Sequence, residues 1–126
     1  MSNIILTTGT YDLIKDHVRR KKVSLLEEKI LTNEIKNAKQ VLRRELPQDV
    51  VCINSILTYK NLTNNEEKKI TIVGPNKSKP SKNKISILSD EAIAMVGHSV
   101  GSIIEWPSIK KGNLKLEIIS VEHIDK

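Results

Sequence analysis

Phenylalanine is absent from the sequence, and the only aromatic residues are Tyr11, Tyr59 and Trp106. Ile, Leu and Val dominate the 38% of residues that are apolar, so a core built from this chain must be aliphatic. Three aromatic rings leave little for an aromatic ligand cage, or for a platform on which single-stranded bases stack. The composition therefore disfavours both kinds of binding site.

Cysteine and histidine are also scarce. The single cysteine, Cys52, cannot form an internal disulfide, and its apolar surroundings favour a small buried side chain. His17, His98 and His123 lie far apart, and none has the spacing of a metal site. A nucleophile elbow and a phosphate-binding P-loop are both missing. We therefore expect no metal, no cofactor and no catalytic residue, and a protein that is not an enzyme.

Long apolar runs are missing as well. None approaches the roughly 18 residues that a membrane span needs, and the first residues lack the pattern of a signal peptide. A chain of 126 residues has room for one ordinary domain, or for a small domain with an appendage. We expect a cytoplasmic, monomeric protein without membrane contact.

Positive charge is in excess, with 21 basic and 15 acidic residues and a net charge of +6. Residues 1–46 hold 10 basic and 6 acidic residues, a net charge of +4, which leaves +2 for the remainder. Such a surface can attract nucleic acid or an acidic protein face.

The first 46 residues predict two helices. Apolar spacing predicts one from Thr10 to Lys21. The second begins at the capping box of Ser24 and Glu27 and runs to about Glu45, because Pro47 disfavours helical backbone at the residue before it. Since the connection is short, we expect an antiparallel hairpin, in effect a short coiled coil.

The tip of this predicted hairpin carries mostly basic side chains. They are Arg19, Arg20, Lys21 and Lys22, followed by the acidic pair Glu27 and Glu28. Cations are favoured at a helix C-terminus, so a solvated helix end is preferred over a phosphate-binding patch. Adjacent helical residues point about 100° apart, so the two glutamates cannot clamp one ion alone.

After residue 46 the apolar residues recur at every second position, as in a strand, rather than at helical spacing. A strand is predicted from Asp49 to Tyr59, and it forms a hairpin with a strand over Lys68–Val73. The final strand is predicted over Leu114–Val121, with Leu114, Leu116, Ile118 and Ser120 on one face. Near-alternating strands with one short helix predict an α+β fold with an antiparallel sheet.

The stretch from Ile85 to Trp106 combines several elements. A strand leads to a helix that begins at Ser89 or Asp90, Gly97 closes the helix, and a return strand follows. Within it, the pattern I-S-x-x-S-x-x-A-x-A-x-x-G-x-x-x-G resembles the C-terminal domain of the GreA/GreB transcription elongation factor family, which has an FKBP-like fold. The segment from Leu46 to Leu62 resembles Rnk, the regulator of nucleoside diphosphate kinase, a short-armed branch of that family.

The resemblance implies two domains, a helical hairpin arm over residues 1–46 and an FKBP-like domain over residues 47–126. It implies that bacterial RNA polymerase is the partner, and that docking uses four residues: Leu88, Ser89, Asp90 and Ile93. The family's Ser-Pro is Ser89-Asp90 here, and Leu88 stands where Asp or Asn is frequent. Gre factors present acidic residues at the tip of a long arm inside the secondary channel, where they help bind a magnesium ion for transcript cleavage. This arm is short and its tip is basic, so we expect competition with cleavage factors rather than cleavage.

Two alternatives come from other classes. An FKBP-like peptidyl-prolyl isomerase would surround its substrate with aromatic side chains, but this domain has only Tyr59 and Trp106. A basic nucleic-acid-binding module would use Arg19–Lys22, Arg43, Arg44 and the lysines of residues 77–84, with weak, non-specific and salt-sensitive contact to phosphates.

Overall fold

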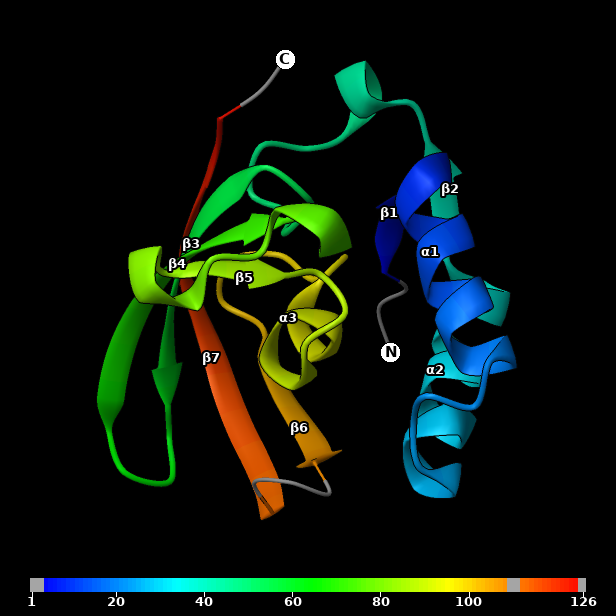
Figure 1. Cartoon of the computed structure of the whole chain (residues 1–126). Coiled ribbons are helices and arrows are strands. Elements are labelled where there is room, and N and C mark those ends of the chain that lie inside the picture. Colours follow the sequence, from blue (N-terminus) through cyan, green and yellow to red (C-terminus); the bar gives the residue numbers. More distant parts are fainter. Residues whose placement is uncertain (1–3, 109–111, 125–126) are drawn as a thin grey trace.

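A five-stranded sheet in the order β5-β4-β3-β7-β6 forms the body of the protein, and a helical hairpin lies beside it (Figure 1). The computed structural model describes residues 4–108 and 112–124. The helices are α1 (Thr8–Arg19), α2 (Leu25–Asn37) and α3 (Asp90–Met95). The strands are β1 (Ile5–Thr7), β2 (Lys39–Val41), β3 (Ser55–Asn61), β4 (Glu66–Val73), β5 (Lys84–Ser86), β6 (Ile103–Ser108) and β7 (Gly112–His123). None of the helices in these ranges is long and apolar enough to cross a membrane.

The predicted helical hairpin is confirmed, with different helix ends. The first helix begins at Thr8, two residues before the predicted start, because Thr7 is its N-cap and accepts a hydrogen bond from the Thr10 backbone N–H at 3.4 Å. The backbone turns at Lys21, which has a φ of 58°, so the helix ends before it. The capping box that opens α2 is present as predicted.

The second helix is shorter than predicted. It ends at Asn37 rather than near Glu45, and Lys39–Val41 forms β2, which pairs in parallel with β1. The Lys39 backbone N–H donates to the Ile4 carbonyl at 2.9 Å, so the N-terminal strand replaces the intrahelical partners of this segment. A strand partner more than 30 residues away overrides local helical spacing.

The sheet is mixed rather than purely antiparallel. Strands β3, β4, β6 and β7 pair antiparallel, but β5 runs parallel to β4, with Thr71 opposite Lys84. Between them, two 3₁₀ turns at Pro75–Lys77 and Pro80–Lys82 return the chain to the C-terminal end of β4. The α+β class is therefore right, and the prediction of an antiparallel sheet is wrong at the β5 edge.

Two further corrections concern strands. The strand predicted from Asp49 begins only at Ser55, because Asn54 has a φ of 63° and interrupts extended backbone. In β7, Leu114, Leu116 and Ile118 are buried as predicted, but Ser120 is exposed. The register shifts between Thr58 and Tyr59 of β3, which reverses the in–out alternation after Ile118.

One aliphatic core joins the sheet, α3 and the hairpin. It combines Leu57 of β3 and Leu116 of β7 with Ile14 of α1 and Leu31 of α2, all at most 2% exposed. Residues before and after position 46 thus share the same hydrophobic cluster, so the hairpin is packed on the body over much of its length.

Gly97 is where the N-terminal strand crosses the end of α3. Its φ of 86° confirms the predicted left-handed turn. An added Cβ would lie 2.9 Å from Ile4 Cβ, closer than atoms pack. The Ile5 backbone N–H donates to the Gly97 carbonyl at 3.1 Å, so glycine permits both the turn and the close approach of β1.

Candidate functional site

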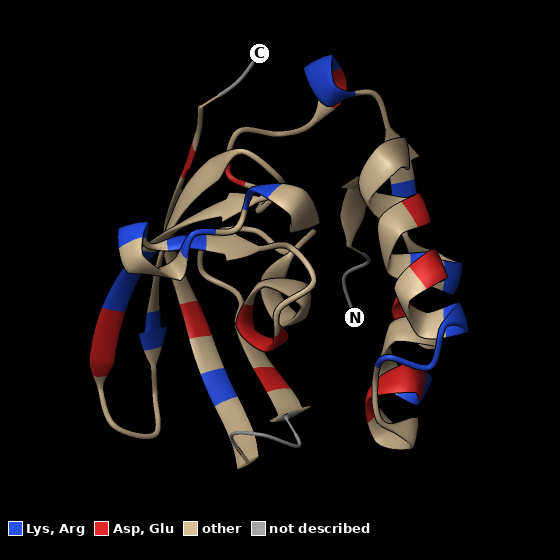
Figure 2. Ribbon diagram, viewed as in Figure 1, with Lys and Arg blue, Asp and Glu red and all other residues tan. Residues whose placement is uncertain are grey.

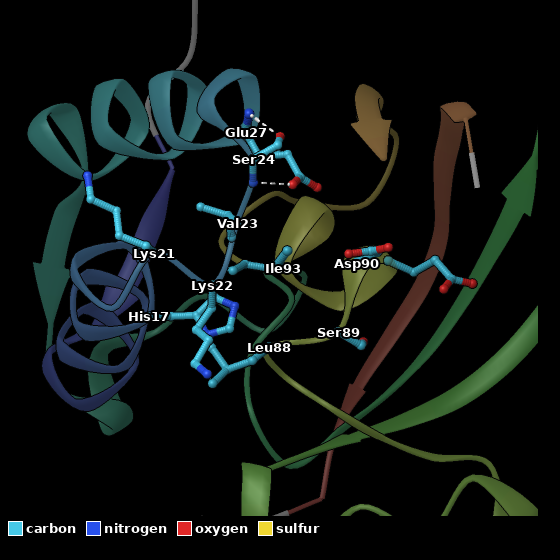
Figure 3. Close-up of a pocket in the computed structure, with 11 residues that line it drawn as sticks. His17, Lys21, Lys22, Val23, Ser24, Glu27, Leu88, Ser89, Asp90 and Ile93 are labelled. Atoms are coloured by element: carbon cyan, nitrogen blue, oxygen red, sulfur yellow. Dashed lines mark hydrogen bonds between the residues drawn. The ribbon is translucent and has the colours of Figure 1, made fainter. Parts of the chain in front are cut away.

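A groove of about 480 Å³ separates the connecting turn of the helical hairpin from the start of α3 (Figure 3). The hairpin wall consists of His17, Lys21, Lys22, Val23, Ser24 and Glu27. The opposite wall consists of Leu88, Ser89, Asp90, Glu91 and Ile93. The structure therefore places the four residues predicted to dock on a partner across a groove from part of the predicted hairpin tip.

The capping box shapes the hairpin wall. Ser24 Oγ accepts from the Glu27 backbone N–H at 3.1 Å, and Glu27 Oε1 accepts from the Ser24 backbone N–H at 2.9 Å. The other carboxylate oxygen, Oε2, accepts from Trp106 Nε1 at 3.2 Å. Glu27 is only 5% exposed, so it joins the hairpin to β6 rather than presenting a free carboxylate.

A second polar contact joins α2 to the turn that follows α3. His98 Nε2 and Glu34 Oε2 lie 3.1 Å apart, and both side chains are partly buried. Together with the bond between Glu27 and Trp106, this contact fixes one long side of the hairpin against the body. The groove walls are thus held at a defined separation.

His17 adds an imidazole to the hairpin wall. Burial lowers its pKa below the usual 6.5, and the positive charge of Lys22 lowers it further. The ring is therefore neutral at pH 7. It therefore adds no charge to the two lysines on this wall.

The α3 wall combines apolar and acidic side chains. Ile93 is buried at 3% exposed, while Leu88, Ser89 and Asp90 are half-buried. Ser89 is the N-cap residue of α3, as predicted, but its Oγ makes no cap hydrogen bond. This oxygen is buried and has no hydrogen-bond partner among the residues that the structure describes.

Glu91 links the acidic wall to β3 of the sheet. Its Oε2 accepts from the Tyr59 hydroxyl at 2.9 Å. Burial raises the pKa of Tyr59 well above its usual range, and the Glu91 charge raises it further. Tyr59 therefore stays a neutral donor that orients Glu91.

The remaining tip residues lie outside the groove. Arg19 and Arg20 both pair with Asp16, at 2.6 Å and 2.9 Å, on the outer surface of α1. The hydrogen bond from Arg19 lowers the pKa of Asp16. Glu28 pairs with Lys21 at 3.3 Å. These side chains are engaged with neighbours on their own hairpin.

Sequence reasoning missed several groove residues as functional candidates. His17, Val23, Ser24 and Glu91 all line the walls. Both Ser24 and Glu91 could have been found from neighbouring residues. Ser24 belongs to the capping box, and Glu91 lies in the acidic first turn of α3. No local sequence pattern marked His17 and Val23 as groove residues, because they line the groove only when the hairpin packs on the body. Among residues 4–108 and 112–124, no three His, Cys, Asp or Glu side chains gather as a metal site would require.

A family comparison gives these residues a context. The family model described as "Transcription elongation factor, GreA/GreB, C-term" matches residues 46–123, which include the whole α3 wall. The chain belongs to the GreA/GreB family. The predicted family membership is therefore confirmed.

Two relatives show how this GreA/GreB member compares in sequence. Transcription elongation factor GreA of Clostridium botulinum (strain Langeland) is 38% identical over 91 residues, which cover 72% of this chain and 56% of GreA. The regulator of nucleoside diphosphate kinase of Escherichia coli (strain K12) is 30% identical over 93 residues, 74% of this chain and 68% of that protein. The chain thus spans just over half the length of the GreA proteins that it matches. The sequence identity to GreA is higher than the identity to the regulator of nucleoside diphosphate kinase. The predicted closeness to the short-armed branch is therefore not supported by sequence identity.

Solved structures agree with the fold. A GreA/GreB elongation factor from Nitrosomonas europaea superposes with a TM-score of 0.70 at 28% identity, covering 98% of this chain and 100% of that one. Gfh1 from Thermus aquaticus shows a TM-score of 0.51 at 15% identity, covering 97% of this chain and 99% of its own, which indicates a shared fold alone. A helical hairpin on a mixed sheet is therefore the GreA-type architecture.

Proposed function

We propose that this protein regulates transcription by binding bacterial RNA polymerase through the groove between the hairpin and α3. The observation that carries the proposal is the position of Leu88, Ser89, Asp90 and Ile93, which lie within the family-matched region and form one wall of the groove. The family resemblance assigns docking to these positions. A cytoplasmic location follows from this partner.

The chemistry of the groove suits a protein partner. Apolar side chains of Val23, Leu88 and Ile93 lie between cations on the hairpin side and carboxylates on the α3 side. Protein interfaces commonly surround an apolar centre with charged groups, and opposite charges fix the orientation of the partner. We infer that a polymerase segment with an apolar residue and flanking charges of both signs enters here.

Glu27 and Glu28 support competition rather than stimulated cleavage. Glu27 is buried and bonds to Ser24 and Trp106, while Glu28 pairs with Lys21. A carboxylate already engaged in this way gives little attraction to a magnesium ion, and the lysines beside it repel a cation. We infer that the protein occupies the site of a cleavage factor near the secondary channel, as the short-armed branch would.

The rival isomerase function finds less support. Tyr59 and Trp106 are each 2% exposed, and each donates its polar hydrogen to a glutamate. Buried and engaged rings cannot surround a substrate proline.

A retention assay with immobilised bacterial core polymerase tests the proposal. Wild-type protein should be retained at low salt, and Asp90→Lys should weaken retention by tenfold or more, because it reverses the charge of the α3 wall. Asp12→Lys is the matched control, since Asp12 is exposed on α1 and lies outside the groove. Equal retention of all three proteins would refute docking through the groove, and no retention of the wild type would refute polymerase binding.

A further inference from the structure

A lysine-rich surface lies at the β5 edge of the sheet, away from the groove. Residues 68–89 contain no acidic residue, and their cations are Lys68, Lys69, Lys77, Lys79, Lys82 and Lys84, which we call the lysine edge. These six of the 21 basic residues equal the net charge of +6, so the rest of the chain holds 15 basic and 15 acidic residues. This segment therefore carries a net charge of +6, whereas the +4 of residues 1–46 is balanced by the acidic excess elsewhere in the chain.

Three elements bring the lysine edge together. Lys79 and Lys84 face each other across a β-bridge with two backbone hydrogen bonds of 2.8 and 3.1 Å. Strand β5, which begins at Lys84, pairs with β4, and Lys68 and Lys69 of β4 line a hollow of about 420 Å³ with Asn83 and the acidic residue Glu91. Figure 2 shows basic segments of β4, β5 and the turns between them at the side of the sheet opposite the hairpin.

The lysines of this edge are exposed, and none forms an ion pair within the described ranges. By contrast, Arg19 and Arg20 pair with Asp16, and Arg43 donates to the Ile53 carbonyl at 2.6 Å. Lys22 and Arg44 are exposed as well, but the lysine edge is the group that gathers six exposed cations at one edge of the sheet. Unpaired cations gathered at one edge of the sheet create a positive potential that attracts polyanions.

We propose that the lysine edge binds the phosphate backbone of double-stranded DNA without sequence preference. In the described structure, residues 68–89 contribute no exposed large apolar side chain, which disfavours a protein partner. They contain no aromatic residue on which unpaired bases could stack, which favours a duplex over a single strand. Asn76, Ser81 and Asn83 add neutral donors of the kind that contact phosphate oxygens.

This surface is distinct from the groove proposed to bind polymerase, and the two share only the boundary residue Glu91 among their described lining residues. The groove lies between the hairpin and α3, whereas the lysine edge lies on β4 and β5, at the other end of the strand order from β6. One molecule can therefore hold a protein partner in the groove and touch duplex DNA with the opposite edge.

Fluorescence anisotropy with a labelled DNA duplex of mixed sequence, at several salt concentrations, tests the proposal on the full chain. With about four phosphate contacts, the affinity should fall about a hundredfold between 50 and 200 mM salt, with a slope of about −3.6 in the log–log plot. The variant carries K77Q, K79Q, K82Q and K84Q and should lose most of this slope. A second variant with K77R, K79R, K82R and K84R should restore it.

The matched control removes the same charge elsewhere, through K15Q, K29Q, K36Q and K39Q at exposed lysines of the hairpin and β2. It should keep nearly the wild-type slope. An equal loss in this control would show that net charge alone attracts DNA. Equally tight binding of single-stranded DNA, or of anionic phospholipid vesicles, would show a general polyanion surface and overturn the proposal. The K77Q, K79Q, K82Q and K84Q variant should still be retained by polymerase, so the two functions fail separately.

Discussion

The indole Nε1 of Trp106 donates a hydrogen bond to Glu27 Oε2 over 3.2 Å, which links the middle of β6 to the first turn of α2. Both side chains are buried, at 2% and 5% exposed. Because the same carboxylate also accepts from the Ser24 backbone, one acidic residue caps a helix and fastens that helix to the sheet. The position of the groove's hairpin wall depends on this double use.

Glu27→Ala should therefore destabilise the fold. It leaves the Trp106 N–H and the Ser24 N–H without their acceptor, and we expect a loss of about 2–3 kcal/mol in the free energy of unfolding. Urea denaturation followed by the fluorescence of Trp106, the single tryptophan, measures it. Glu28→Ala is the control and should change stability by less than about 1 kcal/mol, since its ion pair with Lys21 is near the surface. Equal stability of the two variants would contradict the linking role of Glu27.

Gly97→Ala should destabilise the protein more than Gly101→Ala. Both glycines have positive φ, 86° and 91°, so alanine at either position pays about 1–2 kcal/mol for left-handed backbone. Only at Gly97 does the new methyl group meet Ile4 and Leu6, at 2.9 and 3.0 Å, whereas the space around Gly101 is open. Overpacking should add about 1 kcal/mol or more. Thermal or urea unfolding compares the two, and equal losses would show that β1 does not pack closely on this turn.

The stability of the protein should depend on His17 at mildly acidic pH. Burial and the nearby Lys22 lower the pKa of this imidazole in the folded state, so below pH 6.5 the unfolded chain binds more protons than the folded one. Stability is therefore intact at pH 7 and falls as the pH drops from 6.5 through the lowered pKa. His17→Gln should remove this part of the loss, and urea midpoints at pH 7 and pH 5 measure it. A pH dependence that does not change in His17→Gln would show that the imidazole is not desolvated by the hairpin packing.

Transcript cleavage distinguishes competition from stimulation. The protein alone should not accelerate cleavage in a backtracked polymerase complex, and it should inhibit a cleavage factor added with it, with relief by an excess of that factor. Glu28→Gln should inhibit as well as the wild type, because Glu28 pairs within the hairpin and does not line the groove. Cleavage by the wild type alone that is lost in Glu28→Gln would instead identify a catalytic tip.

Local patterns predicted the parts of the fold that depend on neighbours in sequence. The capping box at Ser24, the β3–β4 hairpin and the turn at Gly97 each depend on residues a few positions apart, and all three are present. The predicted end of α2 was wrong because β2 forms only by pairing with β1, which is distant in sequence. The parallel pairing of β5 was missed because it too depends on a partner strand, β4. The spacing of apolar residues within a segment does not show which distant strand it will pair with.

The candidate site divides in the same way. Leu88, Ser89, Asp90 and Ile93 could be found from a contiguous pattern that resembles the family. Their position across a groove from Lys22 and Glu27 could not, because it depends on how the hairpin packs against β6. Sequence reasoning thus named residues on both walls, and the fold brought the two walls together.

The hydrogen bond between Ile5 and Gly97 also constrains when the protein can fold. These residues are far apart in the chain, so closing this contact brings a large loss of chain entropy before neighbouring contacts compensate for it. During synthesis, the first strand has no turn to pack on until residue 97 has left the ribosome. The helices between β1 and β2 can form early, but we expect β1 to reach its final place only after residue 97 is available.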